Sequence, residues 1–124
     1  MILILFGLAI GVLVGFLLPM SFSAAYSIYL SVAILAAIDS IFGAFRSNLE
    51  DHFDSMIFLT GFFSNAILAG LLAYIGDVLG IPLYYAAIFV FGVRLFNNLA
   101  IIRRICMERY MKRYRRTEEK KESV

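Results

Sequence analysis

The chain has 124 residues, of which 62% are hydrophobic and 16% are charged, and its formal net charge is +2. A single domain of this size with a mean hydropathy of +0.88 has apolar surface that must face lipid as well as a core. This composition excludes a water-soluble globular protein and predicts an all-α integral membrane protein.

Four stretches are apolar over about the 20 residues that a helix needs to cross the hydrocarbon region. The connections between them are short, so neighbouring helices are expected to run antiparallel. We predict one domain, residues 1–104, formed by a bundle of four transmembrane helices and followed by a basic cytoplasmic tail at 105–124. The predicted spans are 2–18, 24–45, 56–75 and 82–102.

The first stretch carries glycines at strict four-residue spacing, at Gly7, Gly11 and Gly15. Such a stripe lets another backbone approach closely, either inside the subunit or in a homo-oligomer or partner helix. Ser21 and Ser23 imitate the small residues of a signal-peptide cleavage site. No basic segment precedes the apolar run, so we expect this stretch to remain in the protein as a helix.

The connection between the second and third stretches holds Glu50, Asp51, His52 and Asp54. One histidine among carboxylates in a short, flexible loop is weak evidence for a metal site, and no metal is expected. We expect a solvated loop in which Asp54 or the next residue, Ser55, caps the third helix.

A polar layer is predicted at one depth in the bundle. At 1.5 Å per residue, Asp39 lies roughly 10 Å, Asn65 roughly 13 Å and Arg94 roughly 12 to 14 Å from the cytoplasmic surface. Asp39 is the only carboxylate deep inside a predicted span and Arg94 the only basic residue there, so we expect a buried ion pair. Asn97 and Asn98 share a helical face with Arg94 and can satisfy the remaining donors and acceptors.

Two interpretations of this layer stay open. In the first, the ion pair and its amides hold the helices together and fix their register. In the second, Asp39 and Arg94 line a path for a proton or a solute. The sequence has no second intramembrane carboxylate, histidine chain or internal repeat that supports transport, so the structural interpretation is favoured.

The placement of the basic residues predicts the orientation. Seven of the eleven Lys and Arg residues lie between Arg103 and Arg116, and Arg46 follows the second span. The positive-inside rule puts the C-terminus in the cytoplasm, and four crossings then put the N-terminus there too. The single cysteine, Cys106, is expected to be a reduced thiol at the cytoplasmic mouth, either inert or palmitoylated.

The tail combines basic residues with Met107, Tyr110, Met111 and Tyr114 at helical spacing. If the last helix continues, the tail is an amphipathic extension that rests on anionic headgroups. The alternatives are charge that only sets topology and docking of a cytoplasmic protein; nucleic-acid binding is not expected. The end, 118–122, is expected to be disordered. The candidate lipid or partner contacts are Arg103, Arg104, Arg109, Lys112, Arg113, Arg115 and Arg116.

Three stretches carry a family resemblance: YSIYLSVAILAAIDSIFGAFR at 26–46, FLTGFFSNAILAGLLAYIGDVLG at 58–80 and LYYAAIFVFGVRLFNNLAIIRR at 83–104. They contain a lone Asp in an alanine-rich helix, GFF shortly before an Asn, and FG, an Arg and an amide before a double arginine. In these features the chain resembles the small basic protein family of bacterial cell membranes. The glycine-bearing first stretch fits the same pattern.

The resemblance implies a multi-pass protein of the bacterial cell membrane. Genes of that family commonly lie near genes for cell division and envelope synthesis, which implies an association and not a mechanism. Ala44 stands where a second glycine often follows Gly43, and Gly43, Gly61 and Gly92 are expected to pack helices. The positions carried over as the family signature are Asp39, Gly43, Arg46, Gly61, Asn65, Gly92, Arg94, Asn98, Arg103 and Arg104.

No nucleophile, base and orienting group fall together in the sequence, so neither an enzyme nor a cofactor is expected. The leading hypothesis is a non-enzymatic membrane protein that scaffolds or modulates a cell-division or envelope complex, with membrane lipids, further copies or other membrane proteins as partners. The alternative is a small transporter or channel subunit that uses the Asp39 and Arg94 layer.

Overall fold

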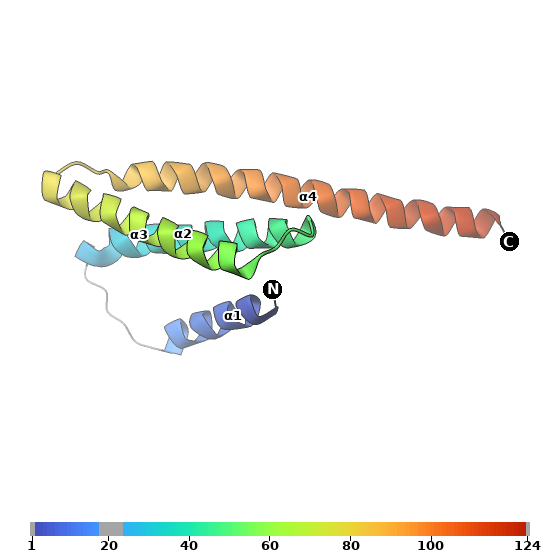
Figure 1. Cartoon of the computed structure of the whole chain (residues 1–124), viewed down its shortest axis with the longest axis horizontal. Helices are drawn as coiled ribbons and strands as arrows, with labels where there is room; N and C mark the ends of the chain where they lie inside the picture. The colour runs from blue at the N-terminus through green and yellow to red at the C-terminus, as the bar shows by residue number, and fades with distance from the viewer. Residues whose placement is uncertain (1, 18–23, 124) are drawn as a thin grey trace.

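The computed structural model describes residues 2–17 and 24–123, and these residues form four helices. Three of the helices pack side by side and run in alternating directions, while the first lies apart from them (Figure 1). The described residues contain no strand, so the predicted all-α class is confirmed. The helices are α1 (Ile2–Leu17), α2 (Ala24–Leu49), α3 (Ser55–Leu79) and α4 (Tyr84–Glu122).

Three helices are long and apolar enough to cross a membrane. Helices α2, α3 and α4 contain 26, 25 and 39 residues. At 1.5 Å per residue, each is longer than the hydrocarbon region of about 30 Å. These helices correspond to the stretches predicted at 24–45, 56–75 and 82–102.

The prediction of a fourth span at 2–18 is wrong for the described residues. Helix α1 is described over 16 residues, about 24 Å of helix, compared with the roughly 30 Å of the hydrocarbon region. The last residue of the predicted span, at position 18, lies outside the described residues. The described part of the chain therefore has three candidate spans and not four.

The glycine stripe of helix α1 is not covered by any described residue. A Cβ built on Gly7, Gly11 or Gly15 would meet no described atom within 4 Å. Large apolar side chains on the same helix are also uncovered, with Leu3 86% exposed and Leu17 72% exposed. Packing of this stripe inside the subunit, one of the two predicted possibilities, is thus absent from the described residues.

The other glycines that the sequence assigned to helix packing behave differently from one another. A Cβ on Gly61 or Gly92 would again meet no described atom within 4 Å, so these positions are open. A Cβ on Gly43 would lie 3.7 Å from Asn98 Nδ2, an ordinary contact between α2 and α4. Only Gly43 of this group therefore lies at a helix contact within the described chain.

The core lies where α2, α3 and α4 meet, and small side chains dominate it. Val32 and Ala36 of α2, Ala69 of α3, and Ala87 and Phe91 of α4 are buried together. Alanines at a helix contact allow close backbone approach, which is the usual way helices associate in a bilayer. Helix α2 contacts both of its partners along this core, whereas α3 and α4 touch each other less.

Local signals in the sequence mark both ends of α3. The Asp54 carboxylate accepts hydrogen bonds from the backbone N–H groups of Met56 at 2.8 Å and Ile57 at 3.0 Å, which makes Asp54 the N-cap. Gly80 ends the helix with a φ of +67°, a left-handed conformation that glycine adopts without strain. Of the two predicted caps, Asp54 is the one observed.

Helix α4 continues well beyond the bundle and ends at Glu122. The expectation of disorder at 118–122 is therefore wrong. Glu118 accepts a hydrogen bond from Lys121 Nζ at 3.0 Å, and Arg104 and Glu108 form a similar pair one turn apart at 3.0 Å. Pairs at this spacing stabilise an exposed helix, and the apolar part of α4 supplies the nucleus that a free peptide lacks.

Candidate functional site

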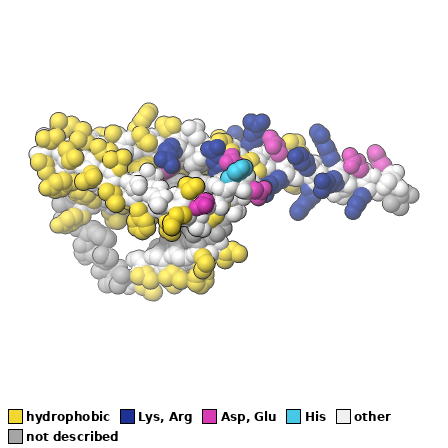
Figure 2. All heavy atoms as spheres, viewed as in Figure 1, with side chains coloured by type: hydrophobic (Ala, Val, Ile, Leu, Met, Phe, Trp, Pro, Cys, Tyr) yellow, Lys and Arg dark blue, Asp and Glu magenta, His cyan; other side chains and the backbone are white. Residues whose placement is uncertain are grey.

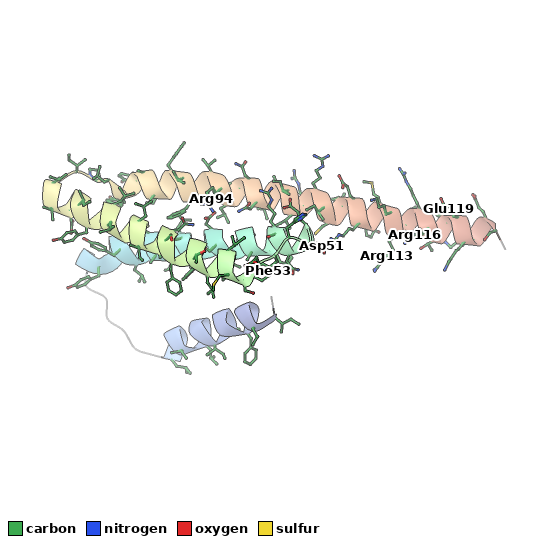
Figure 3. The ribbon with its side chains drawn as sticks, in the orientation of Figure 1. Asp51, Phe53, Arg94, Arg113, Arg116 and Glu119 are labelled. Carbon is green, nitrogen blue, oxygen red and sulfur yellow. The ribbon has the colours of Figure 1, made fainter. Side chains whose placement is uncertain are left out.

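The deepest polar contact in the bundle joins α2 to α4. Arg94 Nη2 lies 3.3 Å from Asp39 Oδ2. The Asp39 side chain is completely buried, whereas 49% of the Arg94 side chain is exposed. Figure 3 labels Arg94 on α4. The two opposite charges that the sequence placed at one depth therefore lie together, and only the arginine reaches the surface of the bundle.

The Asp39 carboxylate has little support besides Arg94. Both of its oxygens are buried and neither has a hydrogen-bond partner among the described residues. A buried charge is tolerated only when it is paired, because desolvation of an ion costs several kcal/mol. The position of Asp39 inside the bundle thus depends on one guanidinium group.

A second polar contact joins the same two helices nearer to the loop. Arg46 Nη1 donates to Asn98 Oδ1 at 3.3 Å, and Arg46 Nε donates to Glu50 Oε1 at 3.1 Å. Asn98 is buried, while Asn97, the next residue, is exposed. The predicted polar face is therefore only partly used: Arg94 and Asn98 bind side chains of α2, whereas the Asn97 side chain makes no hydrogen bond within the described residues.

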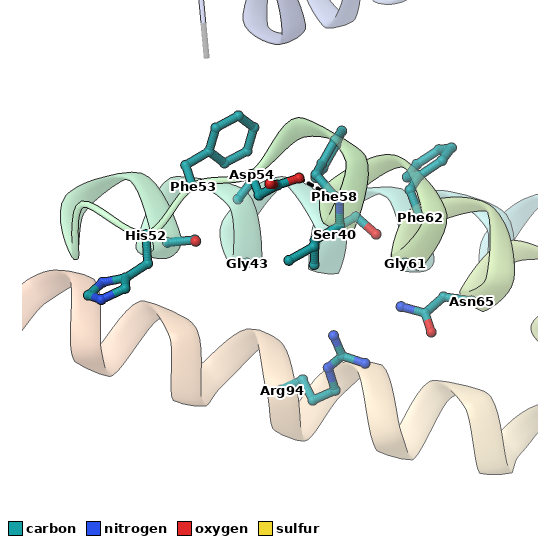
Figure 4. A pocket seen from close by; sticks show the side chains of 13 residues that line it. Ser40, Gly43, His52, Phe53, Asp54, Phe58, Gly61, Phe62, Asn65 and Arg94 are labelled. Carbon is teal, nitrogen blue, oxygen red and sulfur yellow. Dashed lines mark hydrogen bonds between the residues drawn. The ribbon is translucent and has the colours of Figure 1, made fainter.

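A cavity of about 270 Å³ opens between α2 and α3, beside the ion pair (Figure 4). Asn65 of α3 and Arg94 of α4 point into it, and His52 of the loop lies at its other end. The cavity therefore runs from the loop to the exposed side of the Arg94 guanidinium. Its lining comprises Ser40, Gly43, Ala44, Ser47, His52, Phe53, Asp54, Ile57, Phe58, Gly61, Phe62, Asn65 and Arg94.

A different polar contact lies at the other end of the bundle. The Tyr29 hydroxyl donates to Asp77 Oδ2 at 3.0 Å and joins α2 to α3. The buried core around Ala36 and Phe91 separates this end from the cavity that holds Arg94. The cavity beside Tyr29 and the cavity that holds Arg94 therefore lie at opposite ends of the bundle, with packed apolar side chains between them.

Sequence reasoning missed the partners of Arg46 and Asp77. Arg46 serves in the sequence analysis as a charge that sets topology and as a position of the family signature, although its spacing from Glu50 is also a recognisable helical pair. Its bond to Asn98, and the bond from Tyr29 to Asp77, join residues far apart in the chain. Only the relative placement of the helices brings these groups together.

The basic residues after position 102 lie on the part of α4 that projects from the bundle (Figure 2). Arg103 and Arg104 are exposed at the point where the bundle ends. Arg109 Nη2 donates to the backbone oxygen of Leu49 at 2.6 Å, which ties the start of the projection to the C-terminal end of α2. Arg109 lines one groove of the helix surface together with Lys112, Arg113, Arg116, Thr117 and Lys120.

The methionine and tyrosine side chains of the projection lie on a different face. Met107, Tyr110 and Tyr114 are 55%, 69% and 60% exposed. At 100° per residue these three lie roughly opposite to Lys112 and Arg116. The projection is therefore amphipathic, as the spacing of its residues predicts.

The fold and site define an all-helical protein with three apolar helices of spanning length, joined by a polar layer and extended by a basic helix. These features are compatible with a multi-pass membrane protein. The chain belongs to the family described as "Protein of unknown function (DUF1290)", whose profile matches residues 22–107. The matched residues include α2, α3 and the apolar part of α4, but neither α1 nor the end of the projection.

Two relatives give the same assignment. The chain is 49% identical over 98 residues to a "Small basic protein" of Bacillus subtilis (strain 168), covering 79% of this chain and 81% of that protein. It is 38% identical over 99 residues to an uncharacterized protein of Mycobacterium bovis, covering 78% of this chain and 82% of that protein. The predicted membership of the small basic protein family is thus confirmed. No solved structure matches the chain.

Proposed function

We propose that this protein is a non-enzymatic scaffold of the bacterial cell membrane that presents a basic helix to partners in the cytoplasm. One observation carries the proposal: α4 passes without a break from an apolar segment of spanning length into a charged helix outside the bundle. A rigid connection of this kind holds a binding surface at a defined distance from the membrane. Partners in a division or envelope complex are the first class to test, on the strength of the family resemblance alone.

The proposed orientation follows from the basic residues. The projection carries most of the Lys and Arg residues, so the positive-inside rule places it in the cytoplasm. The loop between α2 and α3 then lies on the same side, because α4 and α2 point their C-terminal ends the same way (Figure 1). With three crossings instead of four, α1 lies on the external side, which reverses the position expected for the N-terminus.

The distance of each basic residue from the membrane surface limits how much of the projection can contact lipid. Arg103 and Arg104 lie next to the apolar segment and are placed to meet anionic headgroups. From Arg103 to Glu122 the helix rises about 30 Å, whereas charges in physiological salt are screened over about 8 Å. If the helix stands perpendicular to the membrane, the basic groove around Lys112 and Arg116 is therefore too far from the headgroups for strong attraction to lipid. This distance favours a protein partner at the groove.

Photo-crosslinking in living cells tests this function. A photoreactive amino acid at Lys112 or Arg116 is expected to capture a recurrent protein, while the same group at Val93 in the apolar segment is not. Capture should fall strongly when Lys112 and Arg116 are changed together to Gln. Capture of lipid alone, or capture that is insensitive to these changes, would contradict the scaffold.

The cavity beside Arg94 supports a second candidate, a small transporter or channel subunit. It reaches from His52 in the loop to a charged group in the layer, as one half of a path would. The packed core around Ala36 and Phe91 argues for the scaffold instead, since it occupies the centre of the bundle. Solute flux in proteoliposomes that is lost in a folded Asp39→Asn variant would establish the transporter.

A further inference from the structure

The projection of α4 has an apolar face that no described residue covers. Met107, Tyr110 and Tyr114 are each more than half exposed, on a helix that leaves the bundle behind after the contact between Arg109 and Leu49. In the spanning part of α4 lipid covers such side chains, but lipid ends where the projection begins. In proteins, burial of one apolar face against a neighbour is the usual source of a helix's stability.

The spacing on this face is that of a two-stranded coiled coil. Residues recur at alternating steps of four and three, the a and d pattern of a heptad. The pattern starts inside the spanning part with Phe96, which is 73% exposed. This row of side chains, called the seam below, is therefore continuous from the spanning part of α4 into the projection. Its positions are Phe96, Ala100, Arg103, Met107, Tyr110, Tyr114 and Thr117.

We propose that a second copy of this chain occupies the face, as a short parallel coiled coil of two α4 projections. Copies inserted in one membrane share an orientation, so two projections meet side by side in the parallel sense without any further requirement. Confinement to the membrane also raises the effective concentration of each copy for the other. A short seam therefore suffices for association.

Charge supports this pairing and sets its register. In a parallel pair the g position of one helix faces the next e position of the other, five residues on. Arg113 occupies g and Glu118 occupies e, so each Arg113 meets the Glu118 of the second copy. Arg113 has no ion-pair partner among the described residues. Glu118 contacts Lys121 of its own helix on the exposed surface and would exchange or share that contact in the pair.

One seam position, Arg103, opposes the pairing, since two arginines would face each other there. Arg103 lies where the helix leaves the apolar segment, and a long side chain at that level turns its guanidinium toward the headgroups. Lys112 and Arg116 lie on the far side of each helix and stay open in the pair, whereas Arg113 and Thr117, which line the same groove, lie at its border with the second copy. The inference thus goes beyond the scaffold function, because the groove binds its partner whether or not the copies associate.

Cysteine crosslinking of the full-length protein in native membranes tests the pairing. Cys106 is first changed to Ser, and one cysteine is then introduced as Tyr110→Cys, Tyr114→Cys or, as the control on the opposite face, Lys112→Cys. Mild oxidation is expected to give several-fold more disulfide-linked dimer from the two seam positions than from the control. Equal yields at all three positions, or no dimer from either seam position, would overturn the proposal.

A charge reversal tests the register in the same assay. With the cysteine at position 114, Arg113→Glu is expected to lower the dimer yield several-fold, and adding Glu118→Arg is expected to restore it. A dimer yield that is unchanged by Arg113→Glu, or that stays low in the double variant, would overturn the parallel register. Crosslinking of Tyr114→Cys to a different protein in place of a second copy would also refute the inference.

Discussion

At the scale of single residues, the two members of the ion pair between α2 and α4 differ in burial. Asp39 is fully buried with Arg94 as its one charged neighbour, whereas half of the Arg94 side chain is exposed to a cavity. Loss of the arginine leaves a buried carboxylate without a counter-ion. Loss of the carboxylate leaves a guanidinium that already reaches the surface of the bundle. The two losses are therefore unequal.

This asymmetry gives the first prediction. Arg94→Met is expected to lower the free energy of unfolding by about 3 kcal/mol, in the range for an unpaired buried charge, and Asp39→Asn by clearly less. The double variant should be more stable than Arg94→Met alone, because the uncompensated carboxylate is gone. Unfolding of each purified variant in mixed micelles measures these values; equal losses in the two single variants would contradict the unequal pairing.

A glycine in the last turn of α3, packed against the connection to α4, gives the second prediction. A Cβ on Gly76 would lie 2.5 Å from the backbone oxygen of Ile81 and 2.9 Å from the backbone nitrogen of Leu83. Gly76→Ala must therefore move backbone, and we expect it to cost about 1 to 3 kcal/mol, as overpacking does. Gly61→Ala is the matched control, since its Cβ meets no described atom within 4 Å. A Gly76→Ala variant that unfolds like the control would refute this account.

At the scale of elements, most ends and lengths follow from local sequence. Asp54 and Gly80 delimit α3 by capping, and α4 extends to Glu122 because ion pairs along its surface continue the helix beyond the apolar segment. The prediction of disorder at 118–122 is wrong because mixed charge is typical of disordered ends but does not exclude a helix. The same residues, at the three-residue spacing of Glu118 and Lys121, are also a helix-stabilising pattern.

The N-cap of α3 gives a prediction at this scale. Asp54→Ala removes the acceptor of two backbone hydrogen bonds and should lower the free energy of unfolding by about 1 kcal/mol. Asp54→Asn keeps a side-chain oxygen and should retain most of the stability. Thermal unfolding in detergent compares the two. If Asn is as harmful as Ala, the carboxylate has another role, such as its place in the lining of the cavity.

At the scale of the whole molecule, the number of crossings decides where each end lies. Three helices have spanning length, and α1 is short and stands apart from the bundle. Its open glycine stripe and exposed apolar side chains leave it without a contact in the described chain. We therefore expect the two ends of the protein on opposite sides of the membrane.

Labelling with a membrane-impermeant maleimide tests this topology. In intact cells whose outer envelope layers have been removed, Leu3→Cys in a Cys106→Ser background is expected to react, because the proposed topology puts α1 outside. The native Cys106, which is exposed on α4, is expected to react only after the cells are permeabilised. Protection of both cysteines in intact cells would restore the four-crossing topology.

The sequence by itself determined the apolar composition, the helical class and the position of each charge along its helix, because hydropathy and helical period are properties of local segments. It also placed Asp39 and Arg94 at one level, since depth follows from counting residues along a helix. The tertiary structure decided which groups meet: Arg46 with Asn98, and Tyr29 with Asp77. It also decided that the glycines of α1 face no described neighbour. Contacts between distant segments depend on how the helices are oriented and packed against one another, and no local sequence pattern specifies that orientation.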